Sequence, residues 1–334
     1  MSIGNFYWSK EIDSEYGLEF IILGYMDEIC PEKSLKAWIV PERGSNMCKF
    51  SSGENVLIDF DPELLYKMDY TGTPVLYPTP NRVRNGMFQY KGEIFNQVKN
   101  NEPVFAHGLV HNEKWNYSEP LVSSDCVKMD AWIDFNRESG LFEAFPFNHR
   151  LMLEFKLSID GIRITYMIIN NDVKDIPFGF ALHPYFTKLS GEEGTFITLP
   201  ASCVMDCTAD LLPTGRLIDV GSTIYDLRKP AKIGSLDMDH VFTGIEERKF
   251  TEISYSTKGI DIELNSSEDF THLVLYTPSG KSYFCIENQT CSTDAHNMYD
   301  RGFAVEAGLK FVPAGKSHTG YVKYIVKRWR QDAD

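Results

Sequence analysis

The chain has 334 residues, of which 43% are hydrophobic, 13% aromatic and 24% charged, a composition typical of a globular protein with a large core. Its 47 acidic residues outnumber its 33 basic ones, and the formal net charge is −14. Because so acidic a surface repels phosphate backbones and anionic lipids, we expect an enzyme or binding protein that acts on neither nucleic acid nor membranes.

The first residues, MSIGNFYWSKEIDSEYG, lack a basic segment followed by an apolar core, so no secretory signal is predicted. The apolar run FIILGYM is too short to span a bilayer. The seven cysteines contain no CxxC pair, which favours reduced thiols over a disulfide framework or a zinc site. We therefore predict a cytoplasmic protein without a metal or other cofactor.

The first element with a clear signature is a short helix in DPELLYKMDY. Asp61 suits the N-cap, and Pro62 suits the first helical position because its missing N–H has no intrahelical partner there. Helical patterns are scarce elsewhere, so we expect few and short helices.

The rest of the chain favours β-strands joined by tight turns. Three hairpins are predicted, with turns at Lys91-Gly92, Asp160-Gly161 and Lys258-Gly259, because these residue pairs accept the positive φ angles of a two-residue turn. Apolar residues alternate with mostly polar ones along LMLEFKLSI, as in a half-buried strand. Further strands are expected in SGKSYFCIEN and AGKSHTGYVKYIV.

No linker, charge block or repeat divides the chain. We therefore predict an all-β fold, one large antiparallel β-sandwich domain over residues 1–334. A sandwich of this size has a broad concave face on which side chains from several strands converge.

The stretch FGFALHPYF places one histidine, His183, in an apolar context. Pro184 cannot donate a backbone hydrogen bond, so His183 is expected where a strand gives way to a loop. A lone histidine in such a strand is often only structural. A chemical role depends on polar partners from elsewhere in the chain.

Several polar residues flank predicted strands and are candidate partners: Asn81, Arg82, Arg84, His107, Asp237, Asp239, His240 and Glu287. Glu287 ends an apolar run and is expected to leave its strand for a loop, where a carboxylate suits a general base. His107 and His111 have the spacing of two metal ligands on a helix, but Gly108 between them favours a loop, so no metal site is predicted.

Together these segments resemble the aldose 1-epimerase (galactose mutarotase) family. The matching segments follow the family's order over residues 70–325: PNRVRNGMFQYKGE, AHG with a later tryptophan, FGFALHPYFTKLSG, DMDHVF, and CIENQTCSTDAHN followed by PAGKSHTGYVKY. The resemblance implies a sandwich of the galactose mutarotase type. It also implies exchange of the α and β anomers of a free aldose, a hexose such as glucose or galactose, by a monomer or homodimer.

The resemblance also implies roles for single residues. His183 corresponds to the general acid, Glu287 to the general base, and His107 to the histidine on the ring-oxygen side. Ring opening removes a proton from O1 and gives one to the ring oxygen, which a carboxylate and an imidazolium perform near neutral pH. Glu306 is a rival base, but it lacks the residue pattern that surrounds Glu287.

The resemblance also implies that Asn81, Arg82 and Asp239 bind sugar hydroxyls, with Asp237 as the alternative to Asp239. Three segments depart from the family's pattern. Leu109-Val110 follow His107-Gly108, Asn288 follows Glu287, and the run from YTPSG into CIEN is short, as in the less characterised branches of the family. The branch difference leaves the preferred sugar open.

Three other functions stay open. One is a non-catalytic carbohydrate-binding or sensor protein of the same fold. Another is a sugar-6-phosphate mutarotase, in which Arg82 and Arg84 would meet the phosphate. A glycosidase or lyase is the third, although a glycosidase normally uses two suitably spaced carboxylates.

Overall fold

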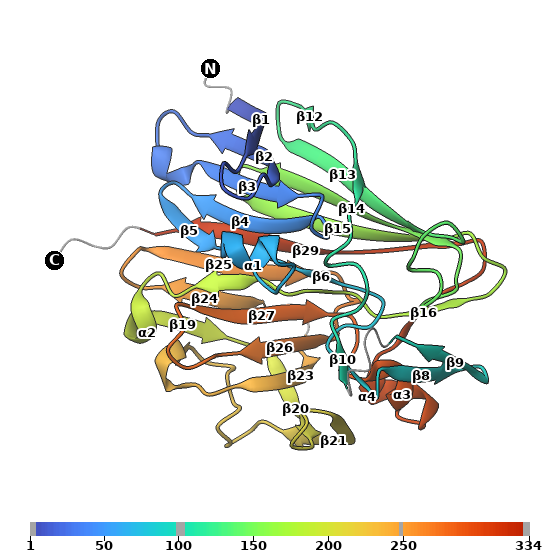
Figure 1. Ribbon diagram of the computed structural model, residues 1–334. Coiled ribbons are helices and arrows are strands. Elements are labelled where there is room, and N and C mark those ends of the chain that lie inside the picture. Colours follow the sequence, from blue (N-terminus) through green and yellow to red (C-terminus); the bar gives the residue numbers. More distant parts are fainter. Residues whose placement is uncertain (1–4, 98–103, 247–249, 330–334) are drawn as a thin grey trace.

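The computed structural model describes residues 5–97, 104–246 and 250–329. Within these ranges the strands form two large sheets and three two-stranded ribbons, and all the paired strands are antiparallel. The two large sheets face each other, since β2 (Glu19–Met26) contacts β13 (Val127–Phe135) and β14 (His149–Ser158) of the other sheet (Figure 1). The prediction of an all-β sandwich is confirmed.

The first sheet has thirteen strands among the described residues. In spatial order, eleven of them are β1 (Asn5–Ile12), β2, β3 (Leu35–Val40), β4 (Asn46–Ser52), β5 (Asn55–Ile58), β18 (Tyr185–Thr187), β27 (Tyr283–Gln289), β26 (His272–Tyr276), β23 (Asp239–Ile245), β20 (Ala201–Cys207) and β21 (Pro213–Asp219). The other two are β17 (Ala181–Leu182), which pairs with β27, and β6 (Val75–Leu76), which pairs with β17.

The second sheet has ten strands in the same described ranges. Its order is β11 (Asn116–Tyr117), β13, β14, β15 (Gly161–Asn170), β29 (Ser317–Arg328), β25 (Ile260–Ser266), β24 (Thr251–Tyr255), β19 (Thr195–Thr198) and β22 (Ala231–Lys232), with β12 (Leu121–Val122) paired to β13.

The remaining elements are short and include the strands that carry part of the candidate site. The ribbons pair β7 (Arg82–Arg84) with β10 (Val104–Ala106), β8 (Met87–Tyr90) with β9 (Glu93–Asn96), and β16 (Ile176–Phe178) with β28 (Lys310–Val312). The helices are α1 (Pro62–Tyr66), α2 (Gly191–Gly194), α3 (Ala295–Asp300) and α4 (Ala304–Ala307), with 3₁₀ turns at Pro31–Lys33 and Ile233–Ser235. Figure 1 shows the β8–β9 hairpin beside α3 and α4, and β8 contacts α3.

Period-two sequence patterns place the core between the large sheets. In β14, Leu151, Leu153, Phe155 and Leu157 are buried and alternate with half-buried neighbours. They belong to one hydrophobic cluster to which both sheets contribute. Removal of this apolar surface from water is the main stabilising contribution to the sandwich.

The predicted helix and hairpins form, with one shift. Pro62 begins α1, and the Asp61 carboxylate caps it by accepting from the N–H groups of Glu63 and Leu64. Lys91 and Gly92 have φ angles of 49° and 82° and make the predicted two-residue turn. In the middle hairpin, however, Ser158 pairs with Gly161, so the turn lies one residue earlier than predicted.

The third hairpin also forms, and its turn is longer than two residues. Tyr255 pairs with Ile260, and Gly259 in the turn has a φ of 61°.

Among the described residues, no helix has both the length and the apolar character needed to cross a bilayer.

Candidate active site

His183 and Glu287 face each other in the first sheet, Glu287 on β27 and His183 in the segment beside it. β17 ends at Leu182, and β18 begins at Tyr185, so His183 lies in a gap between two short strands, as predicted. Ala181 pairs with Gln289 and Tyr185 pairs with Cys285, which sets His183 opposite Glu287. His183 Nε2 lies 3.1 Å from Glu287 Oε1.

Glu287 lies inside its strand and not at the strand's end, so that part of the prediction is wrong. β27 continues to Gln289 because Asn288 and Gln289 still pair with Leu273 and His272 of β26. As a result, Glu287 is only 2% exposed. Its second carboxylate oxygen accepts a 2.9 Å hydrogen bond from Gln289 Nε2, a contact that sequence reasoning missed.

Burial shifts the pKa of both partners towards the uncharged form. It raises the pKa of Glu287 to about 8, and the Asp239 carboxylate adds to the rise while Gln289 and Arg82 oppose it. It lowers the pKa of His183, which is 6% exposed, to about 4. Near neutral pH the pair therefore shares one proton, and burial favours its place on the Glu287 carboxyl.

His107 reaches the pair from a backbone turn. His107 and Gly108 have φ angles of 70° and 74° after β10, and a Cβ on Gly108 would lie 2.3 Å from the carbonyl oxygen of Tyr77. The turn presents the His107 ring to His183 edge-on, with 5.4 Å between the ring centroids. Burial and the neighbouring His183 lower the pKa of His107 well below its usual value.

Two tyrosines border the histidines, and neither was among the candidate residues predicted from the sequence. Tyr185 stacks on His183 with ring centroids 5.0 Å apart. Tyr70 packs against His107 with centroids 4.7 Å apart. Period-two alternation from His183 predicts that Tyr185 shares its face, whereas Tyr70 comes from the segment after α1 and has no such signal.

Asn81, Arg82 and Asp239 also come together, beside the pair. The Asn81 side-chain oxygen accepts from the backbone N–H of Arg82 at 2.8 Å and from its guanidinium at 3.2 Å. The same guanidinium lies 3.7 Å from the Asp239 carboxylate at the start of β23. Asp237 is exposed and precedes the strand, so the structure favours Asp239 as the side-chain partner of Arg82.

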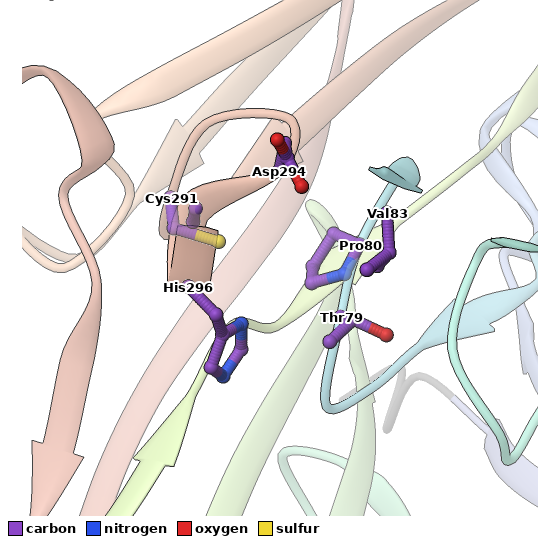
Figure 2. A pocket seen from close by; sticks show the side chains of 7 residues that line it. Thr79, Pro80, Val83, Cys291, Asp294 and His296 are labelled. Atoms are coloured by element: carbon purple, nitrogen blue, oxygen red, sulfur yellow. The ribbon is translucent and has the colours of Figure 1, made fainter. Parts of the chain in front are cut away.

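Asp294, in the segment after β27, contacts strand β7, which contains Arg82 and Arg84. Its backbone N–H donates to the carbonyl of Arg82 at 2.9 Å, and its carboxylate accepts from the N–H of Arg84 at 3.0 Å. The Arg84 guanidinium lies 3.6 Å from the same carboxylate. Figure 2 shows Asp294 and Cys291 facing Pro80 and Val83 across a gap that has no room for a water molecule, so this is a packed junction.

The remaining candidates lie outside this cluster or serve other contacts. Glu306 lies on α4, where its backbone carbonyl is 3.1 Å from His272 Nε2. His111 stacks on Tyr70, the same ring that packs against His107. In the described ranges, no group of three or more His, Cys, Asp or Glu residues has the arrangement of a metal site.

The geometry suits proton transfer to and from two oxygens that share one carbon. A buried acid–base pair provides two proton-transfer atoms in contact, and an arginine, an asparagine and a carboxylate beside it provide donors and acceptors for hydroxyl groups.

Comparison with known proteins finds matches over most of the chain. The family model described as aldose 1-epimerase matches residues 37–324. Bovine galactose mutarotase is 26% identical over 304 residues, which cover 81% of this chain and 84% of that protein.

Solved structures share the fold. A galactose mutarotase-like protein from Clostridium acetobutylicum superposes with a TM-score of 0.82 at 19% identity, over 97% of this chain and 99% of that one. Galactose 1-epimerase from Lactobacillus acidophilus superposes with a TM-score of 0.76 at 15% identity, over 98% and 100%. At these identities the likeness establishes the fold alone.

Proposed function

The chain belongs to the aldose 1-epimerase family, and from that premise we propose that it is a mutarotase that interconverts the α and β anomers of a free aldose. The observation that carries the proposal is the 3.1 Å contact between His183 Nε2 and Glu287 Oε1, with both groups buried. A binding protein has no need of a buried acid–base pair, whereas ring opening requires one.

The reaction moves two protons at one carbon. In the proposed mechanism Glu287 takes the proton of the O1 hydroxyl while imidazolium His183 gives a proton to the ring oxygen, and the C1–ring-oxygen bond breaks. Rotation about C1–C2 turns the other face of the aldehyde to the ring hydroxyl. Closure runs the two transfers in reverse and yields the opposite anomer.

The shared proton lets the pair restore itself. Before ring opening the proton is on His183, and afterwards it is on Glu287, so the two forms contain the same number of protons. Closure returns the proton to His183. In the pair without sugar, burial favours the proton on Glu287, and a transfer along the 3.1 Å contact forms the His183 imidazolium that begins the next turnover. No proton from solvent is needed in each turnover.

The surrounding residues take supporting roles in this proposal. His107, kept neutral by burial, contacts the ring-oxygen side of the sugar. Arg82, Asn81 and Asp239 bind hydroxyl groups. Because Arg84 is engaged by Asp294, the two arginines do not form a free phosphate clamp, and we propose an unphosphorylated aldose.

The names of the relatives suggest which sugars to test first. The bovine relative is a galactose mutarotase, so galactose and its epimer glucose are the first candidates. We propose that the protein acts as a single-domain cytoplasmic enzyme, either a monomer or a homodimer.

Polarimetry of freshly dissolved α-D-glucose and α-D-galactose tests the proposal. The wild-type protein should speed the approach to the same final rotation, and His183→Asn and Glu287→Gln should each slow it by about 10²–10⁴-fold. Sugar binding without acceleration would instead indicate a carbohydrate sensor. Release of monosaccharide from a disaccharide would indicate a glycosidase.

A further inference from the structure

Side chains on the face of the first sheet that holds His183 and Glu287 stand in rows set by strand pairing. His183 and Glu287 form one row. The next row along the strands contains Tyr185 with its partner Cys285, followed by Tyr276 and Asp239 on the neighbouring strands. The row after that contains Thr187 and its partner Tyr283. Each row is two residues further on, or about 7 Å.

A pocket of about 280 Å³ occupies the end of this face, beyond Tyr185. Its aromatic and charged lining consists chiefly of Tyr70, Tyr185, Tyr283, Asp59, Asp61 and Lys281. Tyr185 stacks on His183, and Tyr70 packs against His107. The pocket therefore lies next to the candidate active site, because two of its lining rings also contact the histidines of that site.

The lining selects an uncharged, polyhydroxylated ring. Three tyrosine rings supply apolar faces with polar tips, which suit the alternating CH and OH faces of a sugar. Two exposed carboxylates, Asp59 and Asp61, stand against one exposed ammonium, Lys281, so a phosphate or sulfate group would meet net repulsion. Ligand pockets for drug-sized molecules begin at about 300 Å³. Because one sugar ring is smaller than such a molecule, a pocket of about 280 Å³ has room for one ring.

We propose that this pocket is a subsite for a second sugar unit, and that the preferred substrate is a reducing oligosaccharide. Its reducing-end aldose lies over His183 and Glu287, and the next unit lies among Tyr70, Tyr185 and Tyr283. The inference rests on the proposed mutarotase function. Because C1 of the reacting unit must stay free, the second unit is attached at another carbon, and 4- and 6-linked units extend farthest from C1.

The test compares glucose with disaccharides that have glucose at the reducing end. Polarimetry of freshly dissolved glucose, maltose and melibiose provides kcat/KM for an unsubstituted, a 4-linked and a 6-linked substrate. We expect at least one disaccharide to exceed glucose by about tenfold, the effect of one good aromatic contact. Tyr283→Ala should remove that advantage and leave the glucose rate unchanged.

Two further variants separate the subsite from general damage. Ser282→Trp fills the pocket from an exposed position and should also abolish the disaccharide advantage. Tyr321→Ala removes a half-buried tyrosine from β29 in the other sheet and should not alter the ratio.

The outcomes distinguish failure of the subsite proposal from failure of the mutarotase proposal on which it rests. Acceleration with glucose, but no disaccharide advantage and no change of ratio in Tyr283→Ala or Ser282→Trp, overturns the subsite and leaves the mutarotase proposal standing. No acceleration with any of the three sugars by the folded protein overturns both.

Discussion

His183 and Glu287 titrate as a unit, because their atoms are in contact and both are shielded from water. In the proposed mechanism the active form holds one proton. Below the lowered pKa of His183, about 4, both groups are protonated, and above the raised pKa of Glu287, about 8, neither is. We therefore expect kcat/KM, measured by polarimetry, to be flat between these limits and to fall on both sides. A rate that keeps rising above the upper limit would contradict the shared proton.

The same burial predicts that Glu287 destabilises the fold. Its pKa is raised from 4.5 in the unfolded chain to about 8, so its contribution to stability is most favourable below pH 4.5 and is lost as the pH rises towards 8. A glutamine cannot ionise. It still accepts from Gln289 and donates to neutral His183, as the protonated carboxyl does.

We therefore expect Glu287→Gln to raise the free energy of unfolding at pH 8 by on the order of 2–4 kcal/mol, and by much less at pH 5. Urea unfolding at the two pH values measures the difference. Glu263→Gln is the matched control, because Glu263 is also buried but pairs with Lys327, so its replacement should not stabilise the protein. A Glu287→Gln variant less stable than wild type at both pH values would refute the argument.

The family resemblance indicated which residues would meet in the candidate site, but only part of their surroundings. His183, Glu287, His107, Arg82 and Asp239 gather as expected. The burial of Glu287 was not predicted, since a polar sequence after an apolar run does not reveal that the strand continues to Gln289. Asp294 was also missed as a contact, because it meets a strand 210 residues earlier in the chain.

Asp294 contacts strand β7 through both Arg82 and Arg84, and these contacts predict a change in KM without a matching change in kcat. Asp294 has a φ of 55°, which glycine accepts without strain. Asp294→Gly therefore removes the carboxylate that accepts from Arg84 while it keeps the backbone conformation. We expect KM to rise about tenfold with little change in kcat, because Arg82 then binds the sugar less well while His183 and Glu287 are untouched.

Two comparison variants test whether the carboxylate of Asp294 affects sugar binding through Arg82. Asp294→Asn retains an acceptor oxygen and should restore most of the affinity, which a merely structural loss would not show. Asp300→Ala changes an exposed acidic residue of α3, close in sequence to Asp294, and should leave both constants unchanged. Equal falls in kcat for Asp294→Gly and Asp294→Asn would indicate that Asp294 does not act through Arg82.

The hairpins show how far local patterns determine strand register. A turn at Asp160-Gly161 would pair Ile159 with Ile162, whereas in the structure Leu157 pairs with Ile162. Both registers join apolar residues on the same face, so the alternation cannot choose between them. Contacts outside the hairpin accompany the observed register, since Lys323 of β29 donates to the Asp160 carboxylate at 2.6 Å.

The two sheets share one hydrophobic cluster, which runs from Phe6 near the start of the chain to Tyr324 in β29. Because each sheet buries its apolar face on the other, neither should keep its structure alone. This supports the single-domain proposal. We expect one cooperative unfolding transition, seen at the same urea concentration by tryptophan fluorescence and by far-ultraviolet circular dichroism.

Truncations at distant points of that cluster make the prediction quantitative. Leu23→Ala in β2, Leu153→Ala in β14 and Leu275→Ala in β26 each remove a fully buried leucine from a different region. Each should destabilise the protein by about 2–5 kcal/mol and move the same single transition in both signals. If one of them moved only part of the transition, the region around it would unfold separately.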